Sequence, residues 1–111
     1  MKICEEMVKL REGLDKRNIA WIDKSDITTE ERIKYFISQG ISELFADATM
    51  YRTHFEHKGK KYSVIFGYGS YGGINAINPS QNNGLLELMI DENTPKGWLT
   101  AEDVLNIVDK A

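Results

Sequence analysis

The apolar positions at the start of the chain recur at helical spacing. They are Ile3, Met7, Leu10 and Leu14, which are separated by four, three and four residues. Side chains with this spacing lie along one side of a helix, where they can face a core. The pattern therefore predicts a helix over residues 2–17 with one apolar side.

Two shorter apolar segments follow. Residues 18–22, with the sequence NIAWI, have strand character and predict a short strand. Thr28 and Glu31 then have the spacing of a capping box, which satisfies free amides at the start of a helix. The buried face of this second helix would comprise Ile33, Phe36 and Ile37. Gly40 is expected to end it, and residues 41–48 predict one or two further helical turns.

Residues 50–67 alternate in the way expected of two paired strands. A turn centred on Lys58 and Gly59 places six side chains on one face, by pairing Phe55 with Tyr62, Thr53 with Val64 and Tyr51 with Phe66. The opposite face would carry Arg52, His54, Glu56, Lys61, Ser63 and Ile65. Glu56 then lies opposite Lys61, so that charge and register agree. The sequence therefore predicts a hairpin with one apolar face.

The pattern changes again after the hairpin. Residues 74–84 have no usable period and are rich in asparagine, which predicts a loop. Residues 85–90 predict a strand that is buried on both faces apart from Glu87, and residues 91–97 predict a turn. The chain thus returns to the sheet once more before its last segment.

The last segment begins with helix-capping signals. Thr100 and Asp103 have the spacing of a capping box, and the apolar stripe behind them comprises Ala101, Val104, Leu105 and Val108. The predicted order of elements is α-β-α-β-β-β-α. This order and the short links favour an α+β fold, with a small, mostly antiparallel sheet of about four strands and helices packed on one face. Residues 1–111 are expected to form a single domain.

Composition and charge narrow the range of functions. The 111 residues are 41% hydrophobic and 28% charged, as in an ordinary globular domain. A net charge of −3 disfavours nucleic-acid binding, which needs a clustered basic face. The single cysteine, Cys4, allows no internal disulfide and suits a reducing compartment. No signal peptide or membrane span is recognised, so we expect a cytoplasmic protein without a membrane partner.

Few side chains are candidates for catalysis or metal binding. His54 and His57 are three residues apart, which on a strand points them to opposite faces. No cysteine cluster accompanies them, so neither a metal nor another cofactor is expected. Ser70 lies between glycines but lacks the full nucleophile-elbow pattern and a paired base. A binding role is therefore favoured, and the alternative is a small enzyme that uses Ser70 or His54 on a phosphoester or nucleotide signal.

The segment FGYGSYGG, residues 66–73, is the best candidate for a binding loop. From Gly67 it matches G-x-G-x-x-G, but a dinucleotide fingerprint also needs a helix after the glycines, and residues 74–84 deny one. Glu87 lies 20 residues after Gly67, where a ribose-binding acid would be sought, but without the helix we treat this spacing as coincidence. Two interpretations stay open: a glycine-built bend, or a loop that offers amides to an anion and tyrosines to a base or peptide. The expected ligand-binding residues are Arg52, His54, Gly67, Tyr68, Gly69, Ser70, Tyr71, Gly72 and Gly73.

Three motifs lie within residues 52–105: RTHFEHKGKKYSVIFGYGSYGG, GLLELM and GWLTAEDVL. This stretch resembles a group of small uncharacterised proteins of phages and prophages of gut Firmicutes. The resemblance implies a phage-borne accessory gene, and phage genes of this size often encode inhibitors of host systems. We therefore expect a non-catalytic viral protein that acts in the host bacterial cytosol against a defence system, either by occluding a defence protein or by sequestering a nucleotide-like signal. A structural subunit that forms a homo-oligomer through Trp21 or Trp98 is the further alternative.

Overall fold

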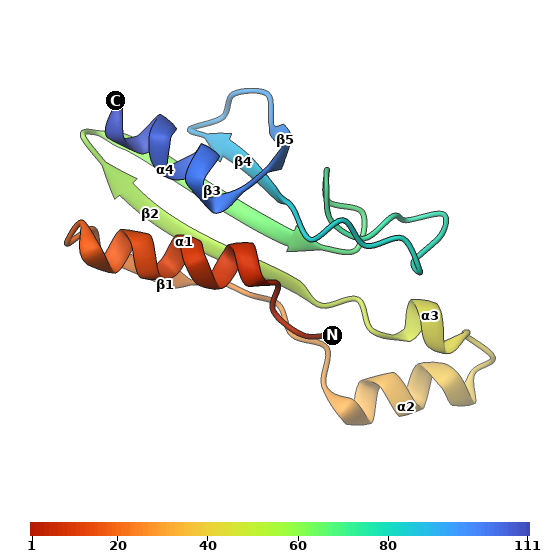
Figure 1. Cartoon of the computed structure of the whole chain (residues 1–111). Coiled ribbons are helices and arrows are strands. Elements are labelled where there is room, and N and C mark those ends of the chain that lie inside the picture. Colours follow the sequence, from red (N-terminus) through yellow and green to blue (C-terminus); the bar gives the residue numbers. More distant parts are fainter.

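The computed structural model describes all of residues 1–111 and has an α+β fold (Figure 1). A five-stranded antiparallel sheet forms its centre, and the strands follow one another in the sheet in the order of the chain. The strands are β1 (Trp21–Asp23), β2 (Met50–His57), β3 (Lys60–Gly67), β4 (Leu86–Ile90) and β5 (Lys96–Leu99). The predicted class is confirmed, and the sheet has one strand more than about four.

Two of the four helices cover one face of this sheet (Figure 1). The helices are α1 (Glu5–Lys16), α2 (Glu30–Ser38), α3 (Glu43–Ala46) and α4 (Ala101–Asp109). α1 and α4 pack against each other and close the core over the sheet. Its largest fully buried side chains are Met7, Leu10 and Leu14 from α1, Val104 and Val108 from α4, and Val64, Phe66, Leu86 and Leu88 from the strands. No helix has the length and apolar character that crossing a membrane requires.

The hairpin of β2 and β3 has the predicted register. Cross-strand partners include Phe55 with Tyr62, Thr53 with Val64, Tyr51 with Phe66 and Glu56 with Lys61. Lys58 and Gly59 form the turn with φ angles of 50° and 77°. Positive φ at both positions matches the twist of the strands, and glycine adopts it without steric cost. The rings of Phe55 and Tyr62 stack with centroids 4.7 Å apart.

The C-terminal third departs from prediction at one strand. The residues predicted as a turn include the start of β5, which pairs with β4 through Leu99 and Leu86. The sequence signal was weak because Gly97 interrupts a strand of only four residues and Trp98 has a φ of 61°. β4 is also not buried on both faces, because Leu86 and Leu88 are buried whereas Met89 is only half-buried. The predicted capping box of α4, formed by Thr100 and Asp103, is confirmed.

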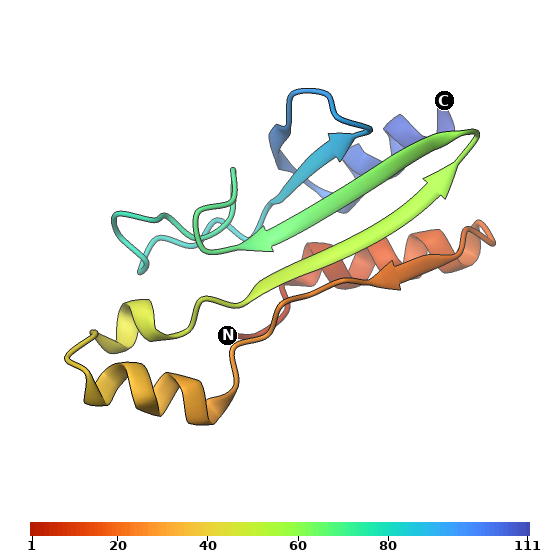
Figure 2. The same ribbon diagram turned by 180° about the vertical axis from the view of Figure 1, so that it is seen from behind.

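The second face of the sheet carries no helix, as Figure 2 shows. We call it the open face, and the strand register arranges its side chains in rows across the strands. One row contains Ile22, His54, Ser63 and Met89, and a neighbouring row contains Arg52, Ile65 and Glu87. The polar residues that the hairpin pattern placed opposite the core therefore line an uncovered surface.

α2 and α3 form an arm beyond one end of the sheet (Figure 2). The prediction that Ile33, Phe36 and Ile37 are buried was wrong, because no residue of α2 is buried. The helix contacts α3 and does not lie on the sheet, so its apolar stripe meets no core. The N-cap also lies one residue later than predicted, at Thr29, whose hydroxyl oxygen accepts a bond from the Arg32 amide.

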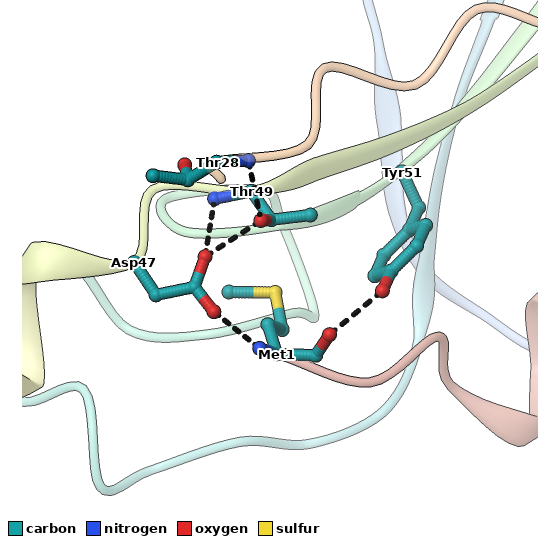
Figure 3. Close-up of polar contacts among 5 residues, drawn as sticks. All are labelled: Met1, Thr28, Asp47, Thr49 and Tyr51. Atoms are coloured by element: carbon teal, nitrogen blue, oxygen red, sulfur yellow. Dashed lines mark hydrogen bonds and ion pairs between the residues drawn. The ribbon is translucent and has the colours of Figure 1, made fainter. Parts of the chain in front are cut away.

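A polar cluster holds the root of this arm (Figure 3). Asp47 accepts bonds from the amide and hydroxyl of Thr49 at 3.1 and 2.6 Å and contacts the amino group of Met1. Thr49 in turn accepts a bond from the Thr28 amide at 3.0 Å, and the Tyr51 hydroxyl donates to the Met1 carbonyl at 2.7 Å. Burial alone would raise the pKa of Asp47, but the bonds from Met1 and Thr49 hold it below its usual value. The cluster joins both ends of the arm to the start of β2.

One buried hydroxyl in the core lacks a partner. Tyr62 is 2% exposed, and its Oη accepts and donates no hydrogen bond. A buried hydroxyl without a hydrogen bond has lost its contacts with water and gained none in return, which destabilises the folded state by about 1–3 kcal/mol. We expect Tyr62→Phe to raise the free energy of unfolding by about 1 kcal/mol, as measured by urea denaturation. A loss of stability would show that the hydroxyl has a partner in solution, and Tyr51→Phe is the control, because it removes a bonded hydroxyl.

Candidate functional site

The glycine-rich loop folds back on the end of β3. The Gly67 carbonyl accepts bonds from the Ser70 amide at 3.3 Å, the Ser70 hydroxyl at 2.9 Å and the Ile74 amide at 3.0 Å. The Ser70 hydroxyl oxygen also accepts a bond from the Gly67 amide at 3.1 Å. Ser70 is buried, and its hydroxyl is engaged in closing the loop.

Two glycines of the loop are required by close approach of the backbone. Gly72 has a φ of +93°, and a Cβ added there would lie 2.8 Å from both Cα and N of Trp98. A Cβ on Gly73 would overlap the Ser70 hydroxyl and lie 2.9 Å from the Gly67 carbonyl oxygen. Larger residues would therefore force the loop away from β5 and from the end of β3. The glycines build a bend, as one of the two sequence interpretations expected.

The amides of this bend are mostly occupied. Besides the Gly67 amide, those of Gly69, Ser70 and Gly73 donate to main-chain carbonyls at 2.8, 3.3 and 3.0 Å. The Tyr71 amide donates to Glu87 Oε1 at 2.8 Å. These five amides are satisfied within the chain, so an anion would have to displace an existing bond to reach any of them. The side chains around the loop are therefore better placed for binding than its backbone.

The two tyrosines of the loop have different surroundings. The Tyr68 hydroxyl donates to the Ala76 carbonyl at 2.6 Å, and its half-buried ring meets Phe45 edge to face at a centroid distance of 6.1 Å. The Tyr71 side chain is 59% exposed. The sequence analysis expected both tyrosines to be available to a ligand, but only Tyr71 exposes most of its surface to solvent.

Trp98 and Glu87 join Tyr71, although neither was assigned to the site from the sequence. The Trp98 amide donates to the Tyr71 carbonyl at 3.1 Å, while the Tyr71 amide donates to Glu87. Trp98 is 61% exposed and has a φ of 61°, a conformation that is rare and strained for a bulky residue. A pocket of about 230 Å³ lies beside this pair and is lined by residues 69–77, Asn83 and Trp98.

The sequence contained only a partial signal for these two residues. Glu87 stood at the distance of a ribose-binding acid from Gly67 and was treated as coincidence. The loop reaches Glu87 without an intervening helix, because Gly67 ends β3 and Glu87 lies on neighbouring β4. Trp98 was named only as a contact of a possible homo-oligomer, and nothing in the sequence pattern connects it with the glycine-rich loop.

Arg52 and His54 lie on the open face, on the same side of the sheet as Glu87. Ile65 separates Arg52 from Glu87 in their row, and strands lie about 4.8 Å apart, so the two backbones are about 10 Å apart. His54 occupies the adjacent row beside Ser63. A shallow depression of about 530 Å³ includes Ile22, His54, Lys61 and Ser63 in its lining. The candidate residues are thus spread across the sheet. Arg52 and His54 lie on β2, Glu87 lies two strands away on β4, and Tyr71 and Trp98 lie next to Glu87 on the side away from β2.

The surroundings of His54 predict that the stability of the fold depends on pH. Partial burial, followed by the charges of Arg52 and Lys24, lowers the pKa of His54 below its ordinary value. The unfolded chain therefore binds a proton at His54 more readily than the folded chain does. The free energy of unfolding is unaffected by His54 above about pH 6.5, and it decreases as the pH falls from there through the lower pKa of the folded state. We expect His54→Gln to flatten the decline of the melting temperature between about pH 7 and pH 5. Ser63→Ala, which alters the same row without removing a titrating group, should keep the slope, and an unchanged slope in His54→Gln would contradict the assignment.

No group of three or more His, Cys, Asp or Glu side chains is arranged to hold a metal ion. Comparisons of the chain with protein-family models, with curated proteins and with solved structures found no match. The candidate site is therefore described by its geometry alone: exposed Tyr71 and Trp98, the Glu87 carboxylate between loop and sheet, and Arg52 on β2.

Proposed function

We propose that this protein is a non-catalytic binding protein of phage type that sequesters a nucleotide-like signal of a bacterial defence system. The observation that carries the proposal is the display of Tyr71 and Trp98 next to Glu87, with Arg52 in the same row of the sheet. The link to phage and defence rests on the resemblance of residues 52–105. The nucleotide-like ligand rests on the chemistry of the side chains.

Each part of such a ligand has a suitable partner. The faces of Tyr71 and Trp98 can stack on a base, which is favourable for any base because all have a π-face. The Glu87 carboxylate uses Oε1 for the Tyr71 amide, so Oε2 can accept a bond from a ribose hydroxyl. The Arg52 guanidinium can bind a phosphate with two parallel bonds. The separation of about 10 Å between the Arg52 and Glu87 backbones keeps base and phosphate at opposite ends of the site.

The cationic surroundings of Arg52 add to this argument. Lys24 and Arg52 both act electrostatically on His54, so positive charge gathers on this part of the open face although the chain is acidic overall. A phosphate would be attracted here and would also favour the protonated form of His54. The acidic part of the open face, with Glu56 and Asp91, lies beyond the row of His54.

A binding role fits the site better than an enzymatic role. The Ser70 hydroxyl is bonded to Gly67 at the end of β3, whereas His54 pairs across the strands with Ser63. A serine nucleophile needs a base within hydrogen-bond reach, and Ser63 rather than Ser70 is the neighbour of His54. Exposed aromatic side chains on a rigid bend are instead typical of recognition surfaces.

The test is calorimetric titration of the purified protein with cyclic dinucleotides and ADP-ribose compounds, followed by chromatography of the recovered ligand. Binding of one of these compounds, recovered unchanged, would support sequestration. Conversion of the compound to a product would favour the alternative of a small enzyme. If none binds, occlusion of a host defence protein becomes the better hypothesis, and the proposed ligand class is rejected.

A further inference from the structure

The arm formed by residues 27–48, which contains α2 and α3, presents apolar surface that the rest of the chain does not cover. α2 has an apolar stripe at helical spacing, Ile33, Phe36 and Ile37, and yet none of its residues is buried. We propose that a second copy of this chain covers the arm, so that the protein is a twofold-symmetric dimer joined through α2 and α3. This surface shares no residue with the proposed ligand site.

The arm has a fixed direction in which to meet a partner. At its root the Thr28 amide donates to Thr49, and Thr49 donates to Asp47, so both ends of the arm are tied to the start of β2 (Figure 3). Phe45 packs against the ring of Tyr68 in the glycine-rich loop. These contacts stabilise a projecting shape, and the radius of gyration is 14.8 Å, against about 13 Å for a compact chain of this length.

The exposed apolar area of the arm is of the size that a stable dimer needs. Five large side chains contribute: Ile27, Ile37, Ile41, Leu44 and Phe45. Their exposed fractions lie between 39% and 58%, so at about 200 Å² for each large side chain they present on the order of 500 Å². A standard interface buries about 800 Å² on each partner, polar rim included. The largest apolar patch on the surface of a typical monomer is about 300–600 Å², so the apolar area of the arm lies in the upper half of this range.

A second copy is the occupant that best explains this surface. The chain must avoid non-specific association from the time it folds, whatever other molecule it later meets. Only its own copies are always present to cover the arm. The apolar stripe is also compatible with a twofold axis. If the α2 helices of two copies pack antiparallel and cross between Ile33 and Ile37, Ile33 of one copy lies against Ile37 of the other. Phe36 then lies near the axis.

Sedimentation velocity over a series of concentrations tests the dimer. The wild-type chain should reach twice the monomer mass. Ile37→Glu and Leu44→Glu, tested separately, should each raise the dimer dissociation constant by about 30-fold or more, because each places a charge in the apolar interface. Glutamate is a good helix former, and circular dichroism would confirm that each variant is folded. Should one variant unfold, the other still decides the question.

Two matched controls replace exposed isoleucines elsewhere. Ile77→Glu alters the most exposed large apolar residue, at 92% exposure, and Ile22→Glu alters the open face. Both variants should remain dimeric. The proposal is overturned if the wild-type chain stays monomeric at every concentration, or if both arm variants leave the dimer intact.

Discussion

Gly72→Ala is expected to lower the free energy of unfolding by about 3 kcal/mol, which would make it one of the most damaging single-methyl additions in the chain. Two effects add at this position. A residue with a Cβ resists the φ of +93° by about 1 kcal/mol. The new Cβ would also lie 2.8 Å from Cα and N of Trp98, and these backbone atoms can retreat only if β5 moves away from the loop.

Gly69→Ala separates these two effects. Gly69 lies in the same loop with a φ of +81°, but a Cβ there meets only the Ala76 Cβ, at an ordinary distance of 3.8 Å. It should therefore cost about 1 kcal/mol, from backbone conformation alone. Urea denaturation monitored by circular dichroism measures both variants. Equal losses in the two variants would show that the loop is not packed against Trp98 as described.

Removing both exposed aromatic side chains is expected to weaken binding of a nucleotide-like ligand by about 1,000-fold, since stacking on an aromatic ring contributes about 2 kcal/mol for each base contact. The proposed variant combines Tyr71→Ala with Trp98→Gly. The main-chain bonds of Tyr71 to Glu87 and Trp98 do not depend on its ring, so the loop should keep its shape. Calorimetric titration with the ligand found for the wild-type chain gives the affinity.

Stability distinguishes a recognition role of Trp98 from a structural one. Glycine adopts a φ of 61° without the strain that tryptophan bears there. Trp98 is 61% exposed, so the packing lost with its buried part and the strain relieved largely offset each other, and Trp98→Gly alone should change the free energy of unfolding by no more than about 1 kcal/mol. Tyr35→Ala is the matched control for binding, because Tyr35 is as exposed as Tyr71 but belongs to the arm. A destabilised Trp98→Gly protein that still binds the ligand would show that the indole is structural.

Local patterns in the sequence were sufficient to predict the elements that depend on them. The hairpin register followed from alternation around Lys58 and Gly59, and the start of α4 followed from Thr100 and Asp103. The apolar stripe of α2 was equally regular, but periodicity shows that a helix has an apolar side and not what covers it. β5 escaped prediction because its pairing with β4 outweighs the poor strand propensity of a short segment with Gly97.

The candidate site was predictable only in part, for a similar reason. Arg52, His54 and the glycine-rich loop were identified from residue type and spacing, and the structure places Arg52 and His54 together on the open face. Tyr68 could not be separated from Tyr71, because its hydroxyl is bonded to Ala76 by a fold-back of the following loop. Trp98 and Glu87 belong to strands whose approach to the loop is a tertiary contact, and no local pattern encodes such a contact.

The order of the strands has a consequence for how the chain reaches its fold. Each strand pairs with the one before it, so the sheet can grow stepwise while the chain is being synthesised, without waiting for distant segments. The contact between α1 and α4 is different, because it joins the two ends of the chain, as the 2.8 Å ion pair of Arg17 with Asp109 illustrates. Until α4 arrives, the apolar side of α1 and the centre of the sheet stay partly exposed to water. The fold is therefore complete only when the nine residues of α4 dock on α1 and the sheet.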